Sequence, residues 1–221
     1  MPQAAAPPPA IVHDLPNVTT DRFAQRMRSR TTEIELLLDA GDFAAVEDKL
    51  SGWVRELPES PLHVAIEPGV AIDTPAAVVA EYLDDFVAEA ATQGKPEVIY
   101  AELNDFAINP DAWFFDLFSF DEDGGREEYD WLGSFSVAAT DRCFIRGLEA
   151  LQSVYDDLEE NAQLLKGHDE ARRLVTLLVI VRFQRLLQEA LAIASCKLPL
   201  LAGAHDQGDE YTVEIRRPQS D

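Results

Sequence analysis

The chain has 221 residues, of which 47% are hydrophobic, and a net charge of -23 at pH 7. This length suits one large domain with a substantial hydrophobic core. The negative charge argues against nucleic acid and anionic membranes as partners, and it favours cationic partners.

The charge is unevenly distributed along the chain. Residues 67–160 contain 23 acidic and four basic residues, which gives this part a net charge of -19. Such a field can accelerate association with a cationic partner by roughly 10 to 1,000-fold at low salt. Solubility, or adaptation to a salty cell interior, explains the same acidity. Charge alone therefore identifies no partner.

Cysteine usage and hydropathy give two further expectations. Cys143 and Cys196 fall in segments whose patterns predict helices, and neither belongs to a C-x-x-C motif. We expect buried free thiols, without a disulfide framework or a zinc site. The first residues lack the features of a signal peptide, and the longest apolar run, residues 174–181, is too short to span a bilayer. A soluble cytoplasmic protein is the expectation.

In chain order, residues 1–18 are rich in proline and alanine and predict a disordered arm. Residues 19–217 are expected to form a single α+β domain, and residues 218–221 a short tail. Residues 62–72 are compatible with a small hairpin or an irregular crossover. Apolar residues at helical spacing, with capping or helix-breaking residues at the ends, predict five main helices, over residues 19–41, 42–58, 74–94, 141–160 and 169–196.

Aromatic and acidic residues concentrate between Glu97 and Trp131, which include nine of the 19 aromatic residues and eleven Asp or Glu. Two stretches within this region, Val98–Phe106 and Trp113–Phe120, are rich in β-branched and aromatic residues. The Asn109-Pro110-Asp111 turn signal lies between them, so they predict a β-hairpin. The second strand reads as central, because Asp116 and Ser119 alone interrupt its apolar run.

The last predicted strand covers residues 211–216. Apolar and polar side chains alternate there, as in a half-buried strand, and it could pair with the hairpin. The predicted helices are segregated before and after the strands, which argues against a doubly wound parallel sheet. The expected fold is therefore α+β, with about five main helices packed on a small antiparallel sheet.

The end of the acidic stretch predicts a binding surface for a basic protein. Acidic residues outnumber basic ones six to one in Asp121–Asp130, beside a Gly124-Gly125 turn and several aromatic residues. Aromatic anchors within an acidic rim are typical of such a surface, because the rings supply affinity and the carboxylates steer association. The alternative is a core sheet with a solvated loop. The predicted partner-binding residues are Asp121, Glu122, Asp123, Glu127, Glu128, Tyr129, Asp130, Trp131 and Phe135.

An enzyme is the alternative class of function, namely a divalent-metal-dependent hydrolase that uses carboxylates of the 102–130 region. A calcium loop of the EF-hand kind is not supported, because Leu132 occupies the twelfth position counted from Asp121. The chain also lacks a P-loop, a G-x-G-x-x-G fingerprint and a G-x-S-x-G elbow. We therefore expect no cofactor and no assigned metal site. The favoured function is a non-enzymatic acidic binding protein, an inhibitor or immunity-type neutraliser of a cationic protein. The hydrolase candidates are Glu102, Asp105, Asp116, Asp121 and Asp123.

Overall fold

The structure is a computed structural model that describes residue 30 and residues 32–104, 112–161, 167–205, 207 and 211–217. The chain divides into two compact units, residues 1–36 and 37–221. In the first unit, residues 32–36 are helical. The second unit has the expected α+β fold and contains every site discussed below. Three of the predicted features lie outside the described residues: the arm over 1–18, the turn over 109–111 and the tail over 218–221.

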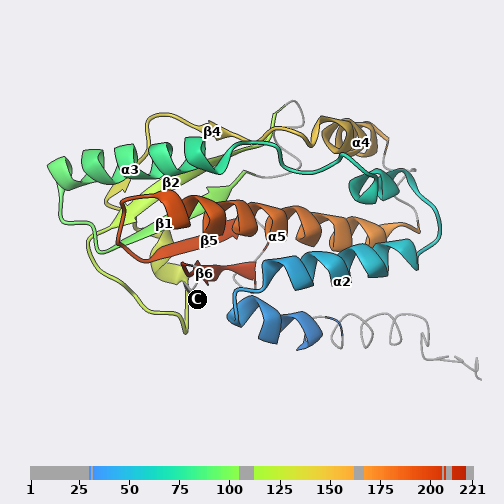
Figure 1. Cartoon of the computed structure of the whole chain (residues 1–221), viewed down its shortest axis with the longest axis horizontal. Coiled ribbons are helices and arrows are strands. Elements are labelled where there is room, and N and C mark those ends of the chain that lie inside the picture. The colour runs from blue at the N-terminus through green and yellow to red at the C-terminus, as the bar shows by residue number, and fades with distance from the viewer. Residues whose placement is uncertain are drawn as a thin grey trace, which may run out of the picture. The chain divides into compact units, whose positions relative to one another are not determined.

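The second unit is built on a mixed sheet (Figure 1), which has six strands among the described residues. The strand order is β3-β2-β1-β5-β6, and β4 also pairs with β2. The antiparallel pairing of β1 with β2 confirms the predicted hairpin strands, whereas β1 and β5 pair in parallel. The strands are β1 (Val98–Leu103), β2 (Phe114–Phe120), β3 (Val137–Ala138), β4 (Cys143–Phe144), β5 (Leu200–Ala204) and β6 (Val213–Ile215).

Helices α3 and α5 lie across one face of this sheet, and α2 runs beside α5 (Figure 1). The middle of α5 is buried all round from Leu174 to Val181, as its apolar run, which only Thr176 interrupts, predicts. Asp42, the first residue of the segment predicted to be helical over 42–58, caps α2, because its side chain accepts a hydrogen bond from the Ala45 amide. The helical segments are α2 (Phe43–Arg55), η1 (Pro61–Ile66), α3 (Ala76–Gln93), η2 (Asp130–Gly133), α4 (Glu149–Glu160) and α5 (Asp169–Ile193).

Strand β2 has side chains on both faces of the sheet, because successive residues of a strand point in opposite directions. On the helix side, the Phe115 ring centroid lies 5.0 Å from that of Phe183 on α5 and 5.6 Å from that of Tyr82 on α3. The other face carries the alternate residues, and the segment that follows β2 packs there. This confirms that β2 is a central strand. The residues of the second face are Phe114, Asp116, Phe118 and Phe120.

The helix predicted to begin at Asp141 is wrong over its first eight residues. Cys143 and Phe144 instead form β4 and pair with β2, and α4 begins at Glu149. Gly147 has φ +90 between them, a conformation that ends the extended segment and that residues with a side chain rarely adopt. Phe144, which the helical spacing of the predicted segment would place on the inward face, is 51% exposed. Pairing with the edge of β2 outweighs the helical spacing of the local sequence.

Three further differences concern the stretches between the main helices and strands. Residues 61–66 form the 3-10 helix η1, so neither strand of the alternative small hairpin is present. Strand β5 was not predicted, because it is buried on both faces and its sequence therefore shows no alternation. Strand β6, at the predicted position, pairs with β5 and not with the hairpin.

Both cysteines are free and buried, as expected. Cys143 lies in β4 and Cys196 follows the end of α5, so neither is helical. Burial raises the pKa of the Cys143 thiol to about 11, which keeps it protonated at neutral pH and therefore unreactive. Within the described residues, no helix has both the length and the apolar character needed to cross a membrane.

Candidate functional site: the acidic segment after strand β2

The residues from Asp121 to Phe135, here called the acidic segment, leave the end of β2 and fold back over the sheet face that lies away from α5 (Figure 1). A small apolar cluster holds them there. Three side chains of the segment pack on a patch of β1, β2 and β5 that is made of Val98, Tyr100, Phe120 and Leu201. These three side chains are Tyr129, Trp131 and Leu132. The segment therefore has a core of its own beneath its acidic surface.

Trp131 is the main contact between the segment and the sheet. Its ring meets the Phe120 ring edge to face, with centroids 4.8 Å apart. A Cβ atom at Gly124 would lie 2.3 Å from the Trp131 ring, so this position has no room for a side chain. Trp131 is half-buried and lines a pocket with one side. The indole thus supports the segment from within and also forms part of its surface.

Arg126, the single basic residue of the segment, is engaged within the protein. Its guanidinium binds Asp123 at 2.5 Å and Glu214 of β6 at 3.0 Å. The hydrogen bond from Arg126 lowers the pKa of Asp123, and a further bond from the Gly125 amide acts in the same direction. Asp123 therefore remains ionised. Arg126 fixes the turn to the edge of the sheet and contributes little net positive charge to the surface.

Asp121 ties the beginning of the segment to the connection between α3 and β1. Its carboxylate accepts a hydrogen bond of 3.1 Å from the backbone amide of Lys95. The Lys95 side chain itself points to solvent and pairs with Glu97 at 3.6 Å. With Arg126 and Trp131, this bond gives the segment three separate attachments. Its surface is therefore held in one arrangement.

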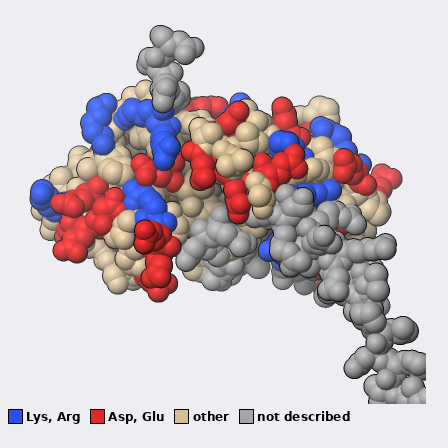
Figure 2. All heavy atoms as spheres, turned by 90° about the horizontal axis from the view of Figure 1, so that it is seen from below, with Lys and Arg blue, Asp and Glu red and all other residues tan. Residues whose placement is uncertain are grey.

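The remaining acids of the segment are exposed. Glu122, Glu127, Glu128 and Asp130 make no ion pair with any residue in the described part of the chain. Figure 2 shows acidic and basic side chains on one face, with acids gathered at its left end, where the acidic segment lies in Figure 1. Mutual repulsion of these carboxylates is relieved by solvent or by a cation from outside.

An aromatic ring and a pocket accompany these carboxylates. Phe135 is 48% exposed, and its ring lies 4.9 Å from that of Phe118 on the sheet. A pocket of about 330 Å³ opens beside it, between the end of β2 and the segment. Its walls combine rings, carboxylates and hydroxyls, from Phe120, Asp121, Glu122, Gly124, Trp131, Ser134 and Ser136.

The structure brings together two of the carboxylates proposed for a hydrolase. Glu102 on β1 and Asp116 on β2 are opposite each other in the strand register. His205 Nδ1 lies 3.4 Å from the first, and Arg142 Nε lies 3.6 Å from the second. Burial raises the pKa of Asp116, and the charge of Arg142 opposes this shift.

The other hydrolase candidates do not join this pair. Asp121 and Asp123 lie beyond the opposite end of β2, where they bind Lys95 and Arg126, and Asp105 lies outside the described residues. Among the side chains that the structure describes, no three His, Cys, Asp or Glu come together in a way that could hold a metal ion.

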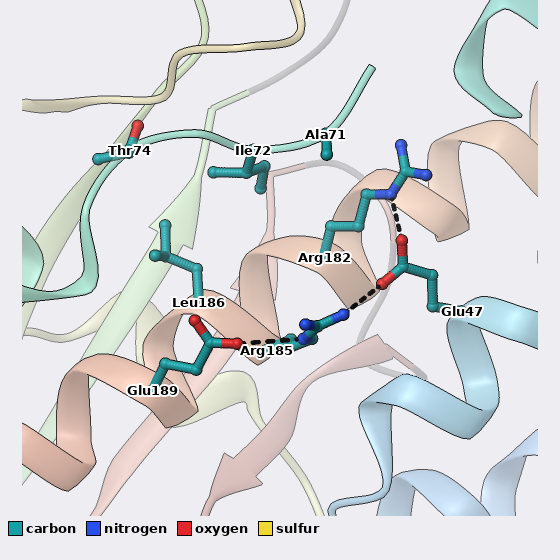
Figure 3. A pocket seen from close by; sticks show the side chains of 8 residues that line it. All are labelled: Glu47, Ala71, Ile72, Thr74, Arg182, Arg185, Leu186 and Glu189. Atoms are coloured by element: carbon teal, nitrogen blue, oxygen red, sulfur yellow. Dashed lines mark hydrogen bonds and ion pairs between the residues drawn. The ribbon is translucent and has the colours of Figure 1, made fainter. Parts of the chain in front are cut away.

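The sequence did not reveal a polar pocket of about 130 Å³ between α2 and α5 (Figure 3). Glu47 of α2 points between two arginines of α5, at 2.7 Å from Arg182 and 3.1 Å from Arg185. Arg182 also donates a hydrogen bond to the carbonyl of Ala65, and Arg185 pairs with Glu189. The charges of this pocket are matched internally, so it joins helices and presents no free charge. Residues so far apart in the chain carry no local signal of the pairing.

Comparison of the chain with protein-family models, curated proteins and solved structures gave no match.

Proposed function

We propose that this protein is a non-enzymatic acidic binding protein that recognises a cationic protein through the acidic segment, and that it inhibits or neutralises that partner. One observation carries the proposal. Arg126, the one base of the segment, is engaged with Asp123 and Glu214, whereas four neighbouring carboxylates have no cation in the described structure. These four are Glu122, Glu127, Glu128 and Asp130. A basic partner would supply the missing positive charge.

The firm attachment of the segment favours binding over mere solubility. Trp131, Arg126 and Asp121 hold the backbone in place, so little chain entropy is lost when a partner binds. A disordered acidic loop would serve solubility equally well without these contacts. The fixed carboxylates give a directed field, which can accelerate association with a basic surface by roughly 10 to 1,000-fold at low salt.

The aromatic side chains indicate which side chains of the partner this surface would bind. Phe135 presents nearly half of its ring to solvent beside the carboxylates, as an apolar anchor for the centre of an interface. The adjacent pocket has the ring of Trp131 in its wall and the carboxylates of Asp121 and Glu122 at its side. A lysine or arginine side chain suits such a pocket, because it combines an apolar stem with a cation that favours both rings and carboxylates.

Affinity capture from the native cell tests this proposal. Three baits should be compared: the wild type, the surface variant E127Q/E128Q/D130N, and the control variant E81Q/D85N/D157N. The control removes the same charge from exposed positions on α3 and α4. We expect one basic protein in stoichiometric amount with the wild type and the control, and much less of it with the surface variant. Equal recovery with all three baits would contradict a role for the acidic segment.

The alternative proposal is a divalent-metal-dependent hydrolase. The specific observation in its favour is the opposed pair of Glu102 and Asp116, whose carboxyl groups share one face of the sheet. A metal ion that binds the folded protein would raise its melting temperature by mass action, and this is the measurement that separates the two functions.

A further inference from the structure

A second pocket lies at the opposite end of β2 from the acidic segment. It has a volume of about 420 Å³ and is lined by residues from the beginning of α3 and from the β4 region. A seven-residue strand spans about 20 Å, so the two sites are separate. Small-molecule sites commonly have volumes of about 300 to 1,000 Å³, and this pocket falls within that range.

One part of this pocket is apolar and open to solvent. Val78 of α3 is 50% exposed and Phe144 of β4 is 51% exposed, and both line it. The Phe144 ring is held edge to face against the Phe114 ring, with centroids 5.8 Å apart. Tyr82 adds a third apolar surface, with its hydroxyl donating to the carbonyl of Asp141 at 2.6 Å. A ligand that covers these side chains would gain from the burial of apolar area.

The other part of the pocket is cationic. Arg142 and Arg146 line it, and none of its eight lining residues is acidic, although the chain has 41 acids against 18 bases. Arg142 lies over the Phe114 ring, 4.2 Å from its centroid, and its one ion pair in the described structure is the 3.6 Å contact with Asp116. The exposed guanidinium of Arg146 has no partner among the described residues. Arg146 is therefore available to an anion, and Arg142, whose contact with Asp116 is long, adds a second positive charge beside it.

The walls of the pocket are fixed by hydrogen bonds across it. Thr74 Oγ1 donates to the carbonyl of Phe144 at 3.3 Å and accepts from the amide of Arg146 at 2.9 Å. The amide of Asp73 donates in turn to the carbonyl of Arg146 at 2.9 Å. These bonds join the beginning of α3 to the β4 region, so the backbone that bears the arginines is held in place.

We propose that this pocket binds a small amphipathic carboxylate. Its carboxylate pairs with Arg146 and Arg142, because a guanidinium matches the geometry of a carboxylate with two parallel hydrogen bonds. Its apolar part lies against Val78, Tyr82 and Phe144. This site is independent of the acidic segment, and it selects a ligand of the opposite charge.

Titration calorimetry with octanoate, and with octan-1-ol as the uncharged probe, tests this proposal. We expect saturable binding of octanoate in a 1:1 ratio. The alcohol should bind more weakly by at least about tenfold, because it lacks the charged hydrogen bonds. R146Q should weaken octanoate about tenfold for the same reason. K95Q is the control, because it removes the same charge from a side chain that is 90% exposed and does not line the pocket. It should leave octanoate binding unchanged.

Three results would overturn the proposal: no octanoate binding at millimolar concentration, equal binding of octanoate and octanol, or equal weakening by R146Q and K95Q. Arg146 is exposed and its side chain has no partner in the described structure, so R146Q should fold. Measurement of its melting temperature checks that it does. Binding of an acidic peptide without binding of octanoate would also refute a small-molecule site.

Discussion

Glu102 of β1 lies directly opposite Asp116 of β2 in the antiparallel register, and each carboxylate has a basic neighbour on its outer side. His205 is beside Glu102, and Arg142 is beside Asp116. Like charges opposite each other destabilise a strand pair, and the charge of Arg142 offsets part of this cost at Asp116. The energetic consequence is a dependence of stability on pH.

Asp116→Asn should stabilise the protein at pH 7 by up to about 1 kcal/mol, because it removes a partly buried charge that also lies opposite Glu102. Burial raises the pKa of Asp116 above its ordinary value of 3.8, so the folded state binds this proton more tightly than the unfolded state. Ionised Asp116 therefore destabilises the folded wild type at neutral pH, and this effect is lost as pH falls through the raised pKa. Urea unfolding should show that the variant gains less free energy of unfolding over the wild type at pH 4 than at pH 7. An undiminished gain at pH 4 contradicts the charge explanation.

Glu47→Ala should lower the free energy of unfolding by about 3 kcal/mol, because it leaves a buried arginine without its carboxylate. The Arg182 side chain is 10% exposed, and Glu47 binds it from α2 (Figure 3). Glu189→Ala is the matched control, since it removes an exposed partner of Arg185 and should cost about 0.5 kcal/mol. Urea midpoints of the two variants give the comparison. Similar shifts would mean that the buried pair contributes no more than the exposed one.

Trp131→Ala and Phe135→Ala should act on different properties. Trp131 packs in the cluster beneath the acidic segment, so its removal should lower stability by about 2 to 3 kcal/mol, somewhat less than for a fully buried ring. Phe135 is half-exposed, and its removal should leave stability within about 0.5 kcal/mol. The partner should dissociate faster from F135A, because loss of an anchor residue lowers the binding free energy by about 2 kcal/mol. Thermal melts and dissociation rates together check this division, and a normal off-rate in F135A refutes the anchor.

Millimolar magnesium, manganese and calcium should leave the melting temperature unchanged beyond the effect of matched ionic strength. The reason is that the hydrolase carboxylates are dispersed: Asp116 and Glu102 lie near one end of β2, and Asp121 lies beyond the other. A metal ion that binds only the native state, present at 100 times its dissociation constant, would raise the free energy of unfolding by about 2.7 kcal/mol. A shift of that size in a thermal melt would instead support the hydrolase.

Much of the fold could be predicted from local sequence. The β-branched and aromatic residues of β1 and β2 predict these strands, the alternation over residues 211–216 predicts β6, and the apolar run interrupted only by Thr176 predicts the buried middle of α5. Strand β5 could not be predicted in this way, because burial on both faces removes the alternation of apolar and polar residues that marks a half-buried strand. The local sequence around Phe144 predicts a helix because its apolar spacing is helical, whereas its extended conformation depends on pairing with the edge of β2.

The acidic segment was identifiable from composition, but its internal order was not. Charge and aromatic content indicated a surface with anchors, yet they could not distinguish Trp131, which packs on Phe120, from the more exposed Phe135. That distinction depends on contacts with β1 and β5, which lie far away in sequence. The pair of Arg126 with Glu214 was likewise hidden, because 88 residues separate them.

Association kinetics with the captured partner test the central claim most directly. At low salt, E127Q/E128Q/D130N should associate about tenfold more slowly than the wild type and depend less on salt, with little change in dissociation, because rim charges act on encounter. E81Q/D85N/D157N, which removes the same number of negative charges, should associate nearly as fast as the wild type. An unchanged association rate in the first variant, or an equal loss in both, would contradict recognition of a cationic partner by the acidic segment.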